Sequence, residues 1–463
     1  MKNAAHSGCY LERGRAKMER PNVIFYFSDQ QRWDTLGCYG QKLPVTPHLD
    51  ELAREGVKFA NAFTCQPVCG PARACLQSGR YATQIGCWRN AQALPQGIPT
   101  LAGAFRGAGY ETAYVGKWHL ASNKSSYEES GGPEDFETRA VPPERRGGYE
   151  YWMASDVLEF TSHGYDGYVF DGDGRRRDFV GYRADCINNY AIQFLHNRRQ
   201  DRPFFLFLSQ IEPHHQNDHH RFEGPDGSRR KFANYEVPGD LIGTEGDWRE
   251  NYPDYLGQCH SLDENVGRLV DTLKDQGLWE NTILFYTSDH GSHFCTRNGE
   301  YKRACHDACT HVPLIAVGGP FQGGKTVDEL VSLLDLPVTL LDCAGITPPK
   351  EFVGHSLLPL LKGDTSGRPE EVFMQISESE IGRAIRTPQY TYCVRAQGDA
   401  WNSPGATLYE EEYFYVLADD PYQRHNRVSD PAFAAARAAC AQRLKARMIE
   451  AGEPEPVIVP KKG

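Results

Sequence analysis

Short apolar runs alternate with amphipathic segments along most of the chain. The runs end in polar residues, as in PNVIFYFSDQQ, RPFFLFLSQIEPHH and NTILFYTSDHG, and they predict buried strands. The segments between them predict helices, including a short one over residues 99–107 and a long one over 253–277. Strands that alternate with helices indicate an α/β fold with a large mixed, mostly parallel sheet flanked by helices.

The pattern changes near residue 366. HVPLIAVGG and LVSLLDLPVTLLDCAG predict one more strand and an apolar helix before that point. Short strand-like runs such as EEVFMQISES and EEYFYVLADD follow it, and a helical segment closes the chain. We therefore expect a main α/β domain over 21–365 and a C-terminal α+β subdomain over 366–463, with a small antiparallel sheet and one helix. Residues 121–180 show little periodicity and predict long insertions near the site.

Composition narrows the function classes. The 463 residues carry a formal net charge of -11, which argues against a nucleic-acid partner. Apolar runs are too short to cross a membrane, and the polar residues 1–20 predict a disordered or non-native leader, with Met18 as an alternative start. The 14 cysteines are scattered without regular spacing, which together with this leader favours a reduced, cytoplasmic protein.

Polar residues follow four of the predicted strands, in FSDQ, VGKWH, IEPHH and TSDHG. Ligands of parallel sheets bind at the carboxyl ends of strands, so we expect these residues to meet. Asp29, Gln30, Asp289 and His290 suit a divalent cation such as Ca²⁺, Mg²⁺ or Mn²⁺. Each aspartate alone is equally consistent with a helix cap.

Several other residues in or near these segments are cationic or potentially cationic. Lys117, His119, His214 and Lys302, together with Arg73, would form a cradle for a tetrahedral oxyanion if they converge. Taken singly, each is as typical of a solvated surface charge or a satisfied histidine.

The stretch VCGPARACLQSGR predicts a short helix. Pro71 suits the first helical turn and Gly79 the end, which puts Cys69 at the helix N-terminus. Free N–H groups there stabilise an anion or a nucleophile. A buried structural cysteine is the alternative interpretation.

These segments together resemble the type I, formylglycine-dependent sulfatases of the alkaline phosphatase superfamily. The resemblance rests on the C-x-P-x-R signature, here Cys69 to Arg73, followed in order by GKWH and SDHG. It implies an alkaline phosphatase-like fold with the catalytic residues in 21–365, and a maturation enzyme that oxidises Cys69 to formylglycine (3-oxoalanine). The hydrated aldehyde would attack sulfur, release the alcohol, and expel sulfate by collapsing to the aldehyde.

The resemblance also implies a metal site. Asp29, Gln30, Asp289, His290 and the modified Cys69 would hold one divalent cation, and Asp289 would accept the proton of the nucleophile. Many family members have aspartate and asparagine where this chain has Gln30 and His290. The resemblance makes Ca²⁺ the first expectation, whereas the missing carboxylate leaves Mn²⁺ and Mg²⁺ open.

The remaining roles follow from the same resemblance. Arg73 and Lys117 would stabilise the hydrate and the growing negative charge, and His119 would remove the second hydroxyl proton. Lys302, Lys117 and His214 would bind sulfate, with His214 as the acid for the leaving alcohol. His215 would contact the substrate, and His311 stands where arginine is common in the family.

The leading hypothesis is hydrolysis of the sulfate monoester of a sugar or small oligosaccharide. The aromatic segments YDGYVFDGDG and GGYEYWMASD are the candidate sugar contacts. A formylglycine-dependent phosphonate monoester or phosphodiester hydrolase is the alternative enzyme, and an unmodified sulfated-glycan binder is the non-enzymatic one. CHDACTH, residues 305–311, is a weaker zinc candidate, and HHQNDHH, residues 214–220, is either a substrate entrance or an exposed loop.

Overall fold

The computed structural model describes residues 20–124 and 134–461. The leader expected over 1–20 lies outside these residues except for Arg20. Within the described part of the chain, every helix is too short or too polar to cross a lipid bilayer.

The described residues form one eleven-stranded mixed sheet at the centre of the molecule, in the order β11-β2-β10-β8-β1-β7-β3-β4-β5-β6, with β9 paired to β2. The central strands β8, β1, β7, β3 and β4 are parallel, and antiparallel pairs occur toward both edges. The strands are β1 Asn22–Ser28, β2 Val57–Phe63, β3 Glu111–Lys117, β4 Tyr151–Ser155, β5 Asp166–Asp171, β6 Arg176–Val180, β7 Phe204–Ser209, β8 Thr282–Ser288, β9 His311–Val312, β10 Leu314–Val317 and β11 Lys325–Ser332.

The apolar runs are explained by burial on both faces of this sheet. Val23 and Phe25 of β1 belong to one core cluster, and Ile24 and Tyr26 belong to the other. Because successive side chains of a strand point to opposite faces, a strand covered on both sides is apolar throughout.

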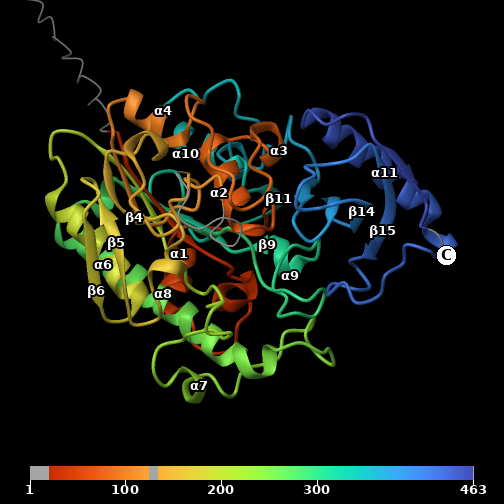
Figure 1. Cartoon of the computed structure of the whole chain (residues 1–463), viewed down its shortest axis with the longest axis horizontal. Coiled ribbons are helices and arrows are strands. Elements are labelled where there is room, and N and C mark those ends of the chain that lie inside the picture. The colour runs from red at the N-terminus through yellow and green to blue at the C-terminus, as the bar shows by residue number, and fades with distance from the viewer. Residues whose placement is uncertain (1–19, 125–133, 462–463) are drawn as a thin grey trace, which may run out of the picture.

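Helices cover the two faces of the sheet. Figure 1 shows α2, α4 and α10 together on one side, with α1, α6 and α8 on the other, which agrees with the two core clusters. The helices are α1 Pro47–Glu55, α2 Cys69–Ser78, α3 Ala82–Ile85, α4 Leu101–Gly107, α6 Arg183–Asn197, α7 Ser228–Lys231, α8 Trp248–Asp275, α9 Asp307–Thr310, α10 Asp335–Cys343 and α11 Ala434–Glu450.

A second, smaller sheet lies at the C-terminal end (blue in Figure 1). Its order is β12-β13-β14-β15-β16, and α11 packs on β12, β13 and β14. The first three pairings are antiparallel, as expected, whereas the short β16 runs parallel to β15. The strands are β12 Val372–Ile376, β13 Ile381–Arg386, β14 Tyr390–Ala396, β15 Leu408–Val416 and β16 Val457–Val459.

Three expectations need correction. The helix predicted over 330–345 begins only at Asp335, because residues 330–332 pair with β2 as the end of β11. The strand predicted for HVPLIAVGG is interrupted at Pro313, which has no N–H to donate. Residues 121–180 are not one structureless insertion, since they contain β4, β5 and β6; residues 125–133 lie outside the description.

Candidate active site

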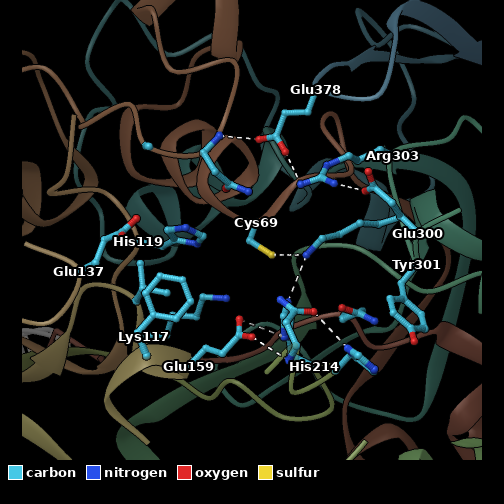
Figure 2. A pocket seen from close by; sticks show the side chains of 18 of the residues that line it. Cys69, Lys117, His119, Glu137, Glu159, His214, Glu300, Tyr301, Arg303 and Glu378 are labelled. Carbon is cyan, nitrogen blue, oxygen red and sulfur yellow. Dashed lines mark hydrogen bonds and ion pairs between the residues drawn. The ribbon is translucent and has the colours of Figure 1, made fainter. Parts of the chain in front are cut away.

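Cys69 lies at the first position of a buried helix. The helix α2 runs from Cys69 to Ser78, and Gly79 follows it with a left-handed φ of 64°. Pro71 occupies the first turn, where its missing N–H breaks no helical hydrogen bond. Cys69 is only 1% exposed, and its sulfur points into a pocket (Figure 2). The helix expected from this stretch is confirmed.

Four potential metal-ligating groups meet at this position. Ligand atoms of Asp29, Cys69, Asp289 and His290 lie within 4.8 Å of one another, and all four residues are buried. His290 Nδ1 lies 2.9 Å from the carbonyl oxygen of Gly291, which assigns the proton to Nδ1 because a carbonyl only accepts. The other ring nitrogen, Nε2, faces the Cys69 sulfur at 3.2 Å. Carboxylate oxygens and an imidazole nitrogen are suitable ligands for a divalent cation.

The charge of this cluster also fits a cation. Burial and the neighbouring Asp29 carboxylate raise the pKa of Asp289 to about 7. Asp289 Oδ2 is buried without a hydrogen-bond donor, and Arg73 Nη2 lies 3.7 Å from it. A buried carboxylate oxygen of this kind needs a positive partner. Gln30 is close by: its backbone N–H donates to Asp289 Oδ1 at 3.0 Å, and its side-chain amide donates to Ser292 Oγ at 3.4 Å.

Two lysines and a histidine approach the Cys69 sulfur and its neighbour Asp29. Lys302 donates from Nζ to the sulfur at 2.7 Å, and the same Nζ lies 3.2 Å from His214 Nε2 (Figure 2). Lys117, at the end of β3, donates to Asp29 Oδ2 at 2.7 Å. Burial alone would raise the pKa of the Cys69 thiol. The positive charges of Lys117 and Lys302 lower this pKa by more than burial raises it, so that it lies well below its ordinary value. The site therefore favours negative charge at position 69.

Arg73 fastens the helix to three strand ends. Its Nη1 donates to the Lys117 carbonyl at 2.9 Å and to Ser209 Oγ at 2.6 Å, and its Nη2 donates to Asp29 Oδ2 at 3.0 Å. These partners lie at the ends of β3, β7 and β1. The buried guanidinium therefore fixes the position of α2 in addition to supplying charge.

His119 lies on a loop whose backbone is hydrogen-bonded to the buried carboxylate of Asp156. Asp156 accepts the backbone N–H groups of Leu120, Ala121 and Ser122 at 2.8, 2.9 and 3.1 Å, and the Ser122 hydroxyl at 2.6 Å. His119 has a left-handed φ of 60°, and its Nδ1 is buried without a hydrogen-bond partner. Asp156, which the sequence analysis missed, thus positions His119.

The pocket above position 69 has a volume of about 610 Å³, which is ordinary for a small-molecule site. We call its inner part the floor; it consists of Cys69, Lys117, His119, His214 and Lys302. We call its outer part the rim, and the sequence analysis identified none of these residues as pocket residues except Asn217 and His220. The rim consists of Asn90, Glu137, Glu159, Phe160, Asn217, His220, Glu300, Tyr301, Arg303, Glu378 and Trp401.

The rim joins the two parts of the chain. Arg303 forms ion pairs with Glu300 and Glu378, and Glu378 also accepts the backbone N–H of Asn90 at 2.6 Å (Figure 2). Glu378 and Trp401 lie beyond residue 366, on turns between the strands of the small sheet. None of these residues directly follows a strand of the large sheet, so the strand-end signal could not reveal them.

The segment HHQNDHH, residues 214–220, contains both residues that line the pocket and residues that face outward. His215 lines the pocket, as predicted; its Nδ1 lies 3.1 Å from Asn217 Oδ1, and its ring lies 4.4 Å from that of Tyr301. Asn217 and His220 also line the pocket, whereas Asp218 and His219 turn outward. The segment is therefore part entrance and part exposed loop.

Two weaker candidates do not belong to a binding site in the structure. In CHDACTH, residues 305–311, His306 bonds with a tyrosine hydroxyl and His311 with a backbone carbonyl, and the metal-ligand clusters among the described residues exclude this segment. The aromatic segments expected to bind sugar instead build β4 and β5. Tyr149 and Trp152, for example, pack in the core and do not line the pocket.

Solved structures give the class of fold. One protein, in complex with its substrate D-glucosamine-2-N,6-O-disulfate, superposes with a TM-score of 0.75 at 22% identity over 95% of this chain and 99% of that chain. The phosphonate monoester hydrolase of Agrobacterium radiobacter superposes with a TM-score of 0.70 at 22% identity, over 93% and 96% of the two chains. These likenesses establish a shared fold and do not separate sulfate from phosphonate chemistry.

Sequence comparison identifies the family. The sulfatase family model matches residues 21–346, and a model for the N-sulphoglucosamine sulphohydrolase C-terminal region matches 299–450. An ulvan-active sulfatase of Formosa agariphila is 30% identical over 94% of this chain and 82% of its own length. An N-acetylglucosamine-6-O-sulfatase of Bacteroides thetaiotaomicron is 26% identical over 76% and 72%. The chain belongs to the sulfatase family and is a sulfuric ester hydrolase.

Proposed function

We propose that this sulfatase hydrolyses a sulfate monoester of a sugar or small oligosaccharide and releases inorganic sulfate. The observation that carries the proposal is the floor, where Lys117, Lys302 and His214 surround position 69 at the bottom of the pocket. Ammonium and imidazole groups arranged in this way bind a tetrahedral oxyanion. The relatives named for ulvan and N-acetylglucosamine support a sugar as the remainder of the substrate.

The rim suits a hydroxylated ring. Glu159, Glu300, Glu378 and Arg303 offer acceptors and donors for sugar hydroxyls. The Trp401 indole, over which the Arg89 guanidinium lies 4.5 Å from the ring centroid, adds an aromatic group to the same rim. The cavity of about 610 Å³ accommodates a sugar of one or two rings next to the sulfate. A short, imported substrate also fits a cytoplasmic enzyme, which the thirteen described cysteines support because all of them are free thiols.

A divalent cation completes the proposed site. Asp29, Asp289, His290 and Gln30 would hold it, with Ca²⁺ as the first choice and Mn²⁺ or Mg²⁺ as alternatives. The cation supplies Lewis-acid polarisation of a sulfate oxygen. Asp289 Oδ2, which accepts no hydrogen bond and lies 3.7 Å from Arg73 Nη2, would thereby gain a closer positive partner.

We assign the nucleophile to position 69, as formylglycine made from Cys69 by a maturation enzyme. The Cys69 sulfur stands in for the oxygen that this residue would carry. The hydrated aldehyde supplies a hydroxyl nucleophile and allows sulfate to leave without a second attack by water. The position fits this chemistry because Lys302 and His290 both contact the side-chain atom there.

The floor residues take distinct roles in this proposal. Lys117 and Lys302 balance charge on the sulfate oxygens, and Arg73 supplies further positive charge. Burial, Lys302 and Lys117 lower the pKa of His214. A bound sulfate offsets both lysines, so that His214 can then hold the proton that the leaving alcohol needs.

Two proton acceptors serve the nucleophile. Asp289 takes the first proton, because its carboxylate lies within 4.8 Å of the side-chain atom at position 69. His119 takes the second from the side chain at position 69, from a loop that Asp156 keeps fixed. His215 lies at the junction of floor and rim and contacts the substrate.

Hydrolysis of phosphonate monoesters or phosphodiesters is the second candidate. Gln30 supports it, because several formylglycine-dependent phosphonate and phosphodiester hydrolases resemble this chain in carrying an Asp-Gln pair, here Asp29-Gln30.

Peptide mass spectrometry tests the central assignment. Trypsin should release residues 59–73, FANAFTCQPVCGPAR, from protein made in a maturation-competent host. We expect an aldehyde at Cys69 with Cys65 unmodified, followed by faster turnover of sulfate monoesters than of phosphodiesters with the same leaving group. Faster diester cleavage would select the second candidate, and an intact thiol in active enzyme would overturn the assigned nucleophile.

A further inference from the structure

We propose that Glu159 is a positioning residue for His214: its carboxylate holds the imidazole with a proton on Nδ1 and stabilises the charged ring that protonates the leaving alcohol. The inference rests on the proposed function, in which His214 is the acid. His214 Nδ1 lies 3.8 Å from Glu159 Oε2, which is an ion-pair distance (Figure 2). The side chains of His214 and Glu159 are only 6% and 7% exposed, so solvent ions screen this pair little.

The group on the other side of the ring selects the tautomer. Lys302 Nζ lies 3.2 Å from His214 Nε2, and an ammonium group can only donate. In the neutral ring Nε2 therefore accepts, and the proton lies on Nδ1, on the side of Glu159. Nδ1 is buried and has no hydrogen-bond partner within the described part of the chain, so the carboxylate at 3.8 Å is the group placed to attract its N–H.

Two contacts fasten Glu159 to the loop that carries His214. Glu159 lies in a short 3₁₀ helix, Leu158–Thr161, that follows β4, whereas the His214 loop follows β7. Glu159 Oε1 accepts the backbone N–H of Asn217 at 2.9 Å, and the Glu159 carbonyl accepts from Gln216 Nε2 at 3.3 Å. The first contact occupies Oε1 and leaves Oε2 on the side of the imidazole. Glu159 thus lines the rim, yet its side-chain contacts lead to the floor.

The charges around His214 leave a role for this carboxylate. Lys302 and Lys117 oppose a positive charge on the His214 ring, and Asp29 favours one. Asp29 is already shared, because it forms buried ion pairs with Lys117 and an arginine at 2.7 and 3.0 Å. Glu159 is not shared in this way: within the described ranges its ion pair is with His214 alone. It is therefore the carboxylate available to the charged imidazole.

One proton moves in the step that this pair assists. As sulfur forms its bond to position 69, the bond from sulfur to the alcohol oxygen breaks, and its electron pair stays on that oxygen. The oxygen takes the proton from His214 Nε2, and the ring becomes neutral with its remaining proton on Nδ1. That tautomer is the one that Lys302 and Glu159 favour before the reaction, so the Nδ1 proton stays in place throughout.

Two aryl sulfates test this role in the full-length protein. Phenyl sulfate and p-nitrophenyl sulfate carry similar rings, but p-nitrophenol is much the stronger acid and leaves without a proton. In Glu159→Gln, we expect kcat/KM for phenyl sulfate to fall by about 10²-fold or more, mainly through kcat, and that for p-nitrophenyl sulfate to stay within about threefold. Neither substrate carries a sugar, so lost sugar contacts cannot produce this pattern.

The amide is informative because its two ends differ. Its oxygen can keep the backbone N–H of Asn217, and its NH₂ group then faces His214 Nδ1, where it opposes the N–H of the charged ring. The variant therefore keeps the loop contact and removes the support for the proton. The melting temperature of Glu159→Gln verifies that the variant is folded.

Glu223→Gln is the matched control. Glu223 lies on the same loop, where it is 2.6 Å from His219 Nδ1 and accepts the Gly164 N–H at 2.8 Å, and it does not line the pocket. This variant should keep the parent's ratio of the two rates. His214→Gln should show the same dependence on the leaving group as Glu159→Gln, and the two losses should not add in the double variant, because both residues act in one proton transfer.

The tautomer of His214 gives a second measurement, which needs no activity. In protein labelled with ¹⁵N-histidine, long-range ¹⁵N–¹H spectra distinguish a proton on Nδ1 from one on Nε2, and the signal missing in His214→Gln identifies His214. We expect the proton on Nδ1 in the parent and in Glu223→Gln, and a larger share on Nε2 in Glu159→Gln.

Three results would overturn the role of Glu159. They are equal losses on both aryl sulfates, no loss on either, and a His214 tautomer that is the same in the parent and in Glu159→Gln. A parent that cleaves aryl phosphodiesters faster than aryl sulfates would instead overturn the proposed function. The same comparison on phosphodiesters would then still decide the role of Glu159, because the leaving alcohol needs a proton in both reactions.

Discussion

Lys302 and Arg303 are neighbours in the chain, yet they serve two different regions. Lys302 belongs to the floor, where it contacts position 69, and Arg303 belongs to the rim, where it pairs with Glu300 and Glu378. In the floor, Lys117, His119 and His214 lie at or shortly after the ends of β3 and β7, Cys69 begins α2, and Lys302 reaches position 69 from the loop before α9. Buried ion pairs tie α2 to the strand ends. The rim is built from loops and from the C-terminal sheet. The comparison shows that the fold positions the groups that bind the sulfate, whereas loops that tolerate sequence change determine which sugar can carry that sulfate.

The largest expected effect comes from removing the nucleophile. We expect Cys69→Ala to lower kcat/KM by at least about 10³-fold on every sulfate ester, because no other group on the floor can replace it. Cys75→Ala is the matched control, since Cys75 is also buried on α2 but does not line the pocket. Steady-state rates with a sugar sulfate and with p-nitrophenyl sulfate measure both. Retained activity in Cys69→Ala would place the chemistry elsewhere.

Lys302→Ala should reduce kcat/KM by about 10²-fold or more, because it removes a preorganised positive charge from the site of developing negative charge. The loss should be similar for p-nitrophenyl sulfate and for sugar sulfates, since the floor contacts only the part that they share. A loss of kcat/KM confined to sugar sulfates would mean that Lys302 contacts the sugar, as the rim residues do, and not the sulfate.

We expect acid to lower the free energy of unfolding through His311. This histidine stacks between Trp33 and Phe63, next to the strand β2 that leads toward Cys69. Burial lowers the pKa of His311 to about 4 from its ordinary value near 6.5. Below pH 6.5 the unfolded chain takes up a proton that the folded chain refuses, so the stabilisation is complete above that pH and is lost as pH falls toward 4.

His311→Phe should remove this acid sensitivity. Between pH 7 and pH 4, we expect the unfolding free energy of the parent to fall by about 3 kcal/mol more than that of the variant. Urea unfolding at several pH values gives the difference. Parallel curves for the two proteins would mean that His311 does not titrate in this range.

The smallest effect is expected at the rim. Arg303→Ala should raise KM for a sugar sulfate by about 10-fold, because it leaves Glu300 and Glu378 without their shared cation and costs one donor to a hydroxyl. Turnover of p-nitrophenyl sulfate should stay within about twofold, since that substrate does not reach the rim. Equal losses on both substrates would show that Arg303 acts through Lys302.

The core of the fold and the floor could be predicted from the sequence for one physical reason. Strands buried on both faces are apolar throughout, so the polar residues that end them, such as Asp29 and Lys117, are visible as abrupt changes. The resemblance to the sulfatases then supplied roles for these positions. Cys69 was identifiable because Pro71 and Gly79 frame its helix.

The rest depends on contacts that leave no local pattern. Asp156 follows β4 but gains its importance from N–H groups on a different loop, and Glu378 and Trp401 reach the pocket from the C-terminal sheet. The boundary between β11 and α10 was misplaced because Leu330 and Val331 are apolar residues that suit a buried strand or a buried helix, and only pairing with β2 decides between them.

The burial of α2 has a consequence for the order of events in the cell. Every residue of this helix is buried, so a modifying enzyme that must read the segment from Cys69 to Arg73 has no access to it once the chain has folded. If Cys69 is matured, the conversion must occur on the nascent, unfolded polypeptide. Competition between that reaction and folding then sets the active fraction, and a molecule that folds first remains inactive until it unfolds or is degraded.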